Sequence, residues 1–275
     1  MFPPSSNPGV ATNTSYKVVV PFYLYASVSF FVATLLLFFS SSAFVQHFFH
    51  PQTLAITHLM ALGWGTMMIL GASHQLVPVL IAGKLHSNIL ALLSFANASI
   101  GIPLLVYAFY HFNFGWPAQW GGILINAAIL FYLINIAISM AKSKKENVHA
   151  VFVFTGTLWL FITILIGLFL VYNFSYNILS EDSLHYLPLH AHIGIIGWFL
   201  LLVLGVGSRL IPMFLISKYD NVKLLWWIYG IINFALLTFV VNFLYMGIWW
   251  LNLVAVVGVF IAILCFARFC YKAYQ

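Results

Sequence analysis

The sequence predicts an all-α, polytopic membrane protein with eight transmembrane helices in two parallel four-helix repeats and both termini in the cytoplasm. Three observations lead to this prediction: the apolar composition, an internal repeat and the placement of the basic residues. Of the 275 residues, 64% are hydrophobic and 5% are charged, and the mean hydropathy is +1.06. Apolar runs of about 20 residues, enough to cross a bilayer as a helix, fill most of the chain. A β-barrel would need alternating apolar and polar residues, which runs such as 30–39 do not show.

The first four apolar runs predict helices over residues 18–42, 52–82, 87–110 and 118–141. Residues 1–17 are polar and are expected to be flexible, without the basic start of a cleavable signal peptide. The first helix is therefore expected to act as an uncleaved anchor. Between the helices, polar and turn-forming residues interrupt the apolar sequence at 46–51, 83–87, 112–117 and 142–147.

The last four apolar runs predict helices over residues 149–174, 186–217, 223–243 and 246–270. They are separated by polar segments at 175–182 and 218–223 and by a tight turn near Met246. The whole chain then divides into the N-terminal segment 1–17, a first repeat 18–141 and a second repeat 142–275.

The repeat is visible in the second and sixth predicted helices. Residues 58–84 align without a gap with residues 192–218, a shift of 134 positions. Because each unit has an even number of helices, both units have the same orientation, related by an axis along the membrane normal. The identical pairs are His58 and His192, Gly63 and Gly197, Trp64 and Trp198, Leu70 and Leu204, Gly71 and Gly205, Leu76 and Leu210, Pro78 and Pro212, and Lys84 and Lys218.

Basic residues lie in or next to the loops on one side of the predicted bundle, whereas Glu181 and Asp182 lie on the other side. By the positive-inside rule the basic side is cytoplasmic. We expect a multi-pass protein of the bacterial cytoplasmic (inner) membrane, with the lipid bilayer as its surroundings. Membrane topology accounts for the net charge of +6, so no nucleic-acid partner is expected. The basic residues that flank the predicted helices are Lys17, Lys84, Lys142, Lys144, Lys145, Lys218, Lys223, Arg268 and Lys272.

The two repeat-related histidines are the strongest candidates for a functional site. His58 and His192 are expected about 6–9 Å below the outer surface, where ionisable groups are costly and are often functional. A pseudo-twofold axis would bring them face to face, and two neutral imidazoles can ligate one metal ion or a haem iron from both axial sides. Hydrogen bonds to neighbouring backbone groups are the alternative reading.

His190 precedes His192 by two residues, so the two rings point about 200° apart around a helix and cannot share one metal. His190 could serve a second centre or be a hydrogen-bonded surface residue. Trp64 and Trp198 could pack on a haem edge or simply fill the core. An outer site for copper or zinc could be formed by His47, His50 and His185. Scattered interfacial histidines without a shared ligand are the alternative reading.

The H-x-H of His190 and His192, with the early His58, resembles subunit I of haem-copper oxidases and nitric-oxide reductases. The residues from His58 to Gly65 and from Gln75 to Val79 resemble that family and the NnrS-type haem and copper membrane proteins. The resemblance covers about a quarter of the chain. It implies that His58 and His192 hold a low-spin haem b and that His190 faces a second centre. Unlike the twelve-helix family, this chain has eight predicted helices and neither copper-ligand motif, the H-x-x-x-Y or the adjacent histidine pair.

These residues lead us to expect a membrane haem b protein, with copper as a second candidate metal, that acts in respiratory electron transfer or nitric-oxide handling. If it is an enzyme, it is an oxidoreductase. Its electron donor would be a quinol or a cytochrome, and it could form homo-oligomers or join a respiratory complex. Two alternatives remain: a copper, zinc or haem transporter or metallochaperone with an outer histidine site, and a non-catalytic subunit of a respiratory complex.

Overall fold

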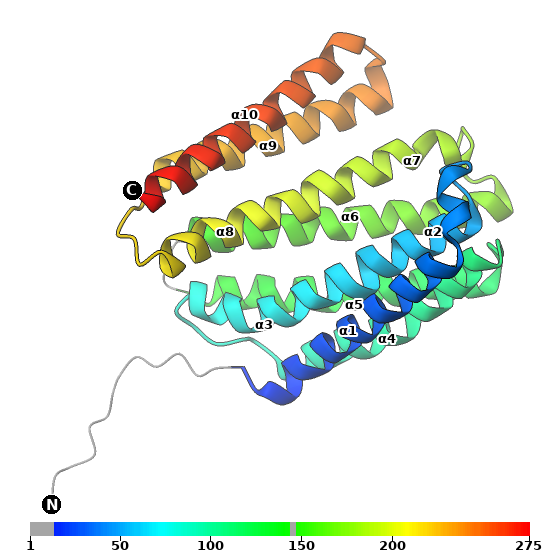
Figure 1. Ribbon diagram of the computed structural model, residues 1–275, viewed down its shortest axis with the longest axis horizontal. Helices are drawn as coiled ribbons and strands as arrows, with labels where there is room; N and C mark the ends of the chain where they lie inside the picture. Colours follow the sequence, from blue (N-terminus) through cyan, green and yellow to red (C-terminus); the bar gives the residue numbers. More distant parts are fainter. Residues whose placement is uncertain (1–13, 144–146) are drawn as a thin grey trace, which may run out of the picture.

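The computed structural model describes residues 14–143 and 147–275 as a bundle of helices lying side by side (Figure 1). Within these residues, eight helices are long and apolar enough to cross a membrane. The expected all-α polytopic class is therefore confirmed, and the predicted ends of the helices are correct to within a few residues. The expectation for residues 1–13, and the topological use of Lys144 and Lys145, lie outside the described residues.

In the part of the chain that the structure describes, the eight spans are built from ten α-helices and three π-helical segments. The first unit contains α1 (Tyr16–Phe39), a short 3-10 turn η1 (Ser41–Val45), the continuous span α2 (Pro51–His58), η2 (Leu59–Thr66) and α3 (Met67–Leu80), then α4 (Asn88–Tyr110) and α5 (Trp116–Ala141). The second unit contains α6 (Val148–Tyr176), the continuous span α7 (Ser183–His192), η3 (Ile193–Leu200) and α8 (Leu201–Phe214), then α9 (Val222–Val241), η4 (Asn242–Met246) and α10 (Trp249–Tyr274).

Polar side chains at the helix starts explain where several helices begin. The first backbone N–H groups of a helix lack intrahelical partners, and a side-chain oxygen just before the helix can accept from them. Tyr16 and Lys17, expected in a flexible segment, belong to α1 because Ser15 caps that helix. Equivalent caps are made by Ser87, Asn147, Asp182 and Asn221.

Structural features recur at the same interval of 134 positions as the sequence match. A π-helical segment starts directly after His58 and again directly after His192, and the helices that follow, α3 and α8, have equivalent bounds. Left-handed residues end both spans, at Ala82 (φ 47°) and Ile216 (φ 53°). The other spans also have near-equivalent bounds. The recurrence of these backbone features therefore extends well beyond the stretch of identical residues, and the division into two repeats stays a prediction.

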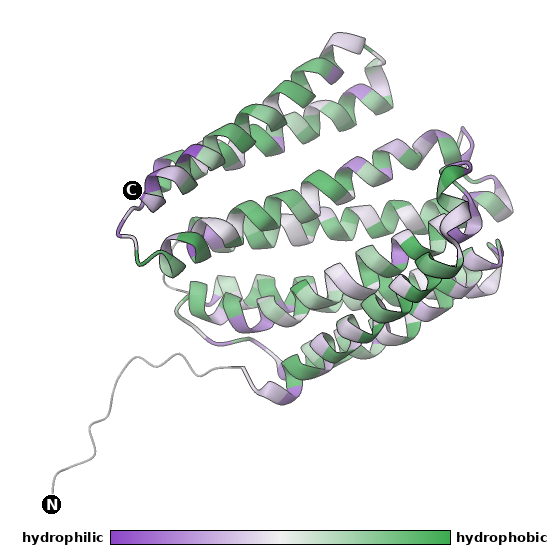
Figure 2. Cartoon of the chain, viewed as in Figure 1, coloured by the Kyte–Doolittle hydropathy of each residue, from purple (hydrophilic) through white to green (hydrophobic). Residues whose placement is uncertain are grey.

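The described basic residues lie at or near the helix ends on the side of the bundle where both described chain ends lie (Figures 1 and 2). Glu181 and Asp182 lie beyond the helix ends on the other side, which we call the opposite end. The bodies of the helices between these ends are largely apolar in Figure 2. The charge placement that predicted the topology is thus present, and the cytoplasmic assignment of the basic side stays a prediction.

Helix α6 joins the two units. Its Leu160 and Ile164 belong to a core cluster formed mainly by the first unit, and its Phe152 and Trp159 belong to the core cluster of the second unit. Glycines on the sixth span allow a close approach, because a Cβ on Gly197 would lie 2.7 Å from the Cβ of Trp159. Small residues at such contacts are typical of membrane helices, which associate largely through van der Waals packing.

We expect Gly205→Val to destabilise the protein by about 1–3 kcal/mol, since a side chain there would overlap Phe152 of α6 and force the helices apart. The measurement is the midpoint of thermal unfolding of the purified protein in detergent. Gly230→Val is the matched control, because no heavy atom lies within 4 Å of a Cβ at that position. Equal midpoints for the two variants would contradict this account of the α6–α8 contact.

Candidate functional site

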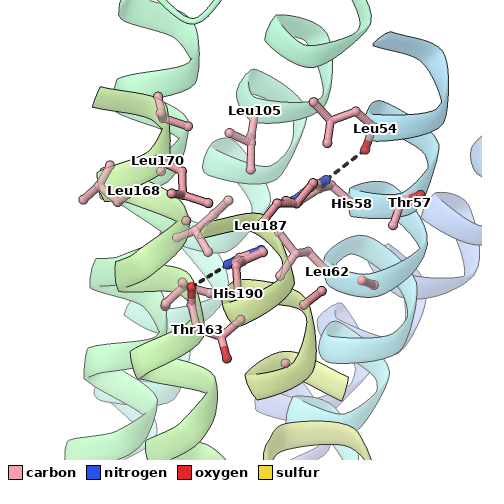
Figure 3. Close-up of a pocket in the computed structure, with 18 of the residues that line it drawn as sticks. Leu54, Thr57, His58, Leu62, Leu105, Thr163, Leu168, Leu170, Leu187 and His190 are labelled. Atoms are coloured by element: carbon pink, nitrogen blue, oxygen red, sulfur yellow. Dashed lines mark hydrogen bonds between the residues drawn. The ribbon is translucent and has the colours of Figure 1, made fainter. Parts of the chain in front are cut away.

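A cavity of about 320 Å³ lies between the two units, in the half of the bundle toward the opposite end. Its walls come from the second span, α4, α5, α6 and the sixth span, and most of the side chains that line it are apolar (Figure 3). Two imidazoles enter it from different units: His58 from the end of α2 and His190 from α7. The cavity volume falls within the range of small-molecule sites, roughly 300–1,000 Å³.

His58 is held by its own helix. Its Nδ1 lies 2.8 Å from the backbone carbonyl oxygen of Leu54, one turn earlier, and its ring packs edge-on against Phe109 with 4.8 Å between ring centroids. A carbonyl oxygen can only accept a hydrogen bond, so Nδ1 carries the proton. In the neutral ring Nε2 is then unprotonated and free to bind a metal.

His190 is held by the neighbouring helix α6. Its Nδ1 donates to the backbone carbonyl oxygen of Thr163 at 2.9 Å, which again leaves Nε2 unprotonated in the neutral ring. Gly167, one turn further along α6, makes room for the ring: a Cβ there would lie 2.9 Å from Cε1 of His190. The position of this imidazole therefore depends on the absence of a side chain at residue 167.

The two imidazoles lie across the cavity from each other with 6.2 Å between ring centroids and 19° between ring planes. Figure 3 shows the carbonyl-bonded nitrogen of each ring turned away from the other ring. Within residues 14–143 and 147–275 neither Nε2 has a hydrogen-bond partner. Two imidazoles on opposite sides of one ion, with metal–nitrogen bonds of about 2 Å, have centroids about 6 Å apart.

A hydrogen bond from the second nitrogen of a ligating histidine to a backbone carbonyl is the usual way in which proteins orient such ligands. Both rings show it here, to Leu54 and to Thr163. The donor set, the spacing and the orienting bonds therefore fit one metal ion, or the iron of a haem, between His58 and His190.

The structure does not bring His58 and His192, the expected pair, together; it places His190 opposite His58 instead. His192 is exposed, donates from Nδ1 to the carbonyl oxygen of Pro188 at 2.7 Å, and packs against Phe239 of α9 at 4.8 Å. It does not line the cavity. The expectation that His190 and His192 point to opposite sides of their helix is met. His190 faces the first unit because the units meet through α5 and α6, rather than through equivalent faces of the second and sixth spans.

The two repeat-related tryptophans have different surroundings. Trp198 lines the cavity, is 1% exposed, and donates from Nε1 to the hydroxyl of Thr66 at 3.2 Å. Trp64 is 39% exposed, packs against Phe30, and does not reach the cavity. Of these two tryptophans, Trp198 is the one placed to contact a ligand bound between the histidines.

The three outer histidines do not form the expected cluster. The ring of His47 packs on Phe48, whereas the ring of His185 packs on Tyr186 and Phe243. Across the described part of the chain, no group of three or more histidine, cysteine, aspartate or glutamate side chains is arranged to hold a metal ion. The structure thus does not join His47, His50 and His185 into a three-ligand site.

Two further residues of the cavity could not be assigned to it from the sequence. Asn126 of α5 donates from Nδ2 to the carbonyl oxygens of Gly122 and Ile164, and its buried Oδ1 has no hydrogen-bond partner. Gly167 gives His190 its space. An asparagine and a glycine inside apolar helices are the available signals, but the sequence does not show which helix each of them faces.

Scans against protein-family models, curated proteins and solved structures found no match to this chain.

We expect Trp198→Phe to lower the stability of the protein by about 1–3 kcal/mol, because the Thr66 hydroxyl would lose its buried donor. The matched control is Trp64→Phe, which removes no hydrogen bond recorded for the described residues and alters an exposed side chain. Unfolding midpoints of the two purified variants measure the difference. A loss that is as large in Trp64→Phe would contradict the distinct surroundings of the two indoles.

Proposed function

We propose that this protein binds haem b between His58 and His190 and transfers single electrons within the membrane, as a respiratory electron carrier or in nitric-oxide handling. The observation that carries the proposal is the pair of facing imidazoles 6.2 Å apart, each with its Nδ1 bonded to a backbone carbonyl and its Nε2 free. The apolar walls of the cavity suit the apolar faces of a macrocycle. The choice of haem b over another metal group rests on the family resemblance of the two histidine-bearing spans.

When bound, the haem would supply one-electron chemistry, and the protein would supply its ligands and surroundings. His58 and His190 would both hold the iron, and two protein ligands suit electron transfer more than the binding of a substrate. The carbonyls of Leu54 and Thr163 would hold the rings in orientation and increase their basicity. The apolar walls, with Trp198 among them, would exclude water and so influence the reduction potential.

A reduced-minus-oxidised visible spectrum of the purified protein tests the axial ligands. We expect the α-band of a b-type haem in the unchanged protein, and its loss in His58→Ala and in His190→Ala, because each removes one ligand. His192→Ala is the control and should keep the band, since His192 faces away from the cavity. Loss of the band in His192→Ala with retention in His190→Ala would instead support the pairing implied by the family resemblance.

The space at Gly167 provides a second test of the site. We expect Gly167→Ala to reduce haem occupancy and shift the reduction potential, because the added methyl would displace the His190 ring. Gly230→Ala, on a helix that does not line the cavity, should change neither property. The haem-to-protein ratio and a redox titration measure these effects. Normal occupancy together with an unchanged potential in Gly167→Ala would show that His190 is not an axial ligand.

A copper ion is the second candidate, because two imidazoles on opposite sides of one ion are an acceptable ligand pair for copper as well. Metal analysis of the preparation used for the spectrum separates these proposals. Stoichiometric copper without haem, lost in His190→Ala, would favour a copper-binding or copper-transport function. A protein purified without either group, and with other respiratory subunits attached, would favour a non-catalytic subunit.

A further inference from the structure

The two units meet where α5 of the first unit packs against α6 of the second. Helix α10, the last helix of the second unit, has no such neighbour within the described chain. In the first unit α5 packs against α6, and Asn126 donates to the carbonyl oxygen of Ile164 across this contact. Helix α10 is the repeat equivalent of α5, yet no helix of the described chain covers the same face of α10. Val256 (67% exposed), Phe260 (59%) and Ile263 (41%) lie open there. Their equivalents Gly122 and Ile129 are buried and Asn126 is half-buried.

Helix α1, at the edge of the molecule away from α10, also has an exposed apolar face. Helix α1 is the repeat equivalent of α6, and its Phe30 and Leu37 are 40% and 41% exposed. The equivalent residues of α6, Ile164 and Val171, are buried at 7% and 4%. Trp64 beside α1 is 39% exposed, whereas its equivalent Trp198 is 1% exposed. The face of α10 that is equivalent to the buried face of α5 is therefore exposed, and so is the face of α1 that is equivalent to the buried face of α6.

His192 lies in an incomplete copy of the cavity. The cavity at His58 includes Leu105 and Phe109 of α4. Their repeat equivalents are Phe239 and Phe243, and the ring of His192 packs on Phe239. The walls that the second unit gives to the first cavity come from α6 and the sixth span, and their repeat equivalents are α1 and the second span. Around His192 no part of the described chain supplies these two walls, and the α1–α2 edge of a second copy has the matching elements. Lipid contact would explain the open apolar faces, but it would leave the polar His192 exposed at a cost.

Side-chain sizes on the two open faces are complementary. Within the chain a small residue meets a large one, because a Cβ on Gly122 would lie 2.8 Å from Cδ1 of Leu168. The equivalent positions on the open faces hold Val256 on α10 and Thr34 on α1. On the open faces the larger side chain, Val256, lies on α10 and the smaller one, Thr34, lies on α1. A large residue would therefore again meet a smaller one, and the two helices can pack closely.

We propose that α10 of one copy packs against α1 of a second copy and repeats the α5–α6 contact, giving a head-to-tail homo-oligomer in the membrane. The interface is heterologous, so it joins different surfaces of the two copies and closes into a ring when the rotation between copies allows it. In this interface α1 and α2 of the second copy cover His192 of the first copy. The proposal depends on the repeat and not on the identity of the bound cofactor.

Disulfide cross-linking in isolated membranes tests the contact. Cys265 and Cys270 are first replaced by alanine, and Thr34→Cys and Val256→Cys are introduced into separate, differently tagged chains that are expressed together. We expect oxidation to join the two tagged chains. Neither single variant expressed alone should form a cross-linked dimer, because the contact joins residue 34 of one copy to residue 256 of another.

Two controls make a negative result decisive. Gly122→Cys with Leu168→Cys in one chain is the internal equivalent of the tested pair and should form an intramolecular disulfide under the same conditions. Thr34→Cys with Leu237→Cys, an exposed position on α9, should not cross-link. The proposal is overturned if the internal pair reacts while the 34–256 pair does not, or if dimers form only between identical positions.

Discussion

The contact between α5 and α6 is the constraint on which the rest of this structure depends. It joins two four-helix units by unlike surfaces, and α6 contributes side chains to the cores of both. Because of it, the carbonyl of Thr163 and the space above Gly167 come to lie beside the first unit, and His190 is held facing His58. The same contact leaves α1 and α10 as uncovered edges. The candidate cofactor site and the candidate assembly surface thus have one structural origin.

The two histidines of the cavity are not related by the repeat, although each is held in a similar way. In both rings Nδ1–H donates a hydrogen bond to a backbone carbonyl oxygen, so a neutral ring presents an unprotonated Nε2 to the cavity. For His58 that carbonyl belongs to its own helix, and for His190 it belongs to the neighbouring one. The cavity is therefore asymmetric with respect to the repeat: one of the two repeat-related histidines, His58, lines it, and the other, His192, is turned outward.

The π-helical segments after His58 and His192 show how the sequence pattern and the backbone are connected. Each adds a wider turn to a long apolar span, and both start at the residue after the repeat histidine. Such segments are rare and frequently occur at functional sites. Their glycines pack closely on the neighbouring helices, as Gly197 does on Trp159, so the wide turn is accommodated by the absence of side chains where the helices approach.

The sequence alone determined the eight spans and their ends to within a few residues, and it marked His58 and the H-x-H pair as candidates through the match between residues 58–84 and 192–218. Apolar length, polar caps and turn residues are local properties, and a repeat can be recognised without knowing how its copies pack. Only the tertiary structure decided that His190, and not His192, lies against His58, and that Trp198 and Asn126 line the cavity while Trp64 and the outer histidines do not. Those outcomes depend on which faces of the helices meet, and in chains this apolar almost every face is equally suited to burial, so hydropathy cannot choose among them.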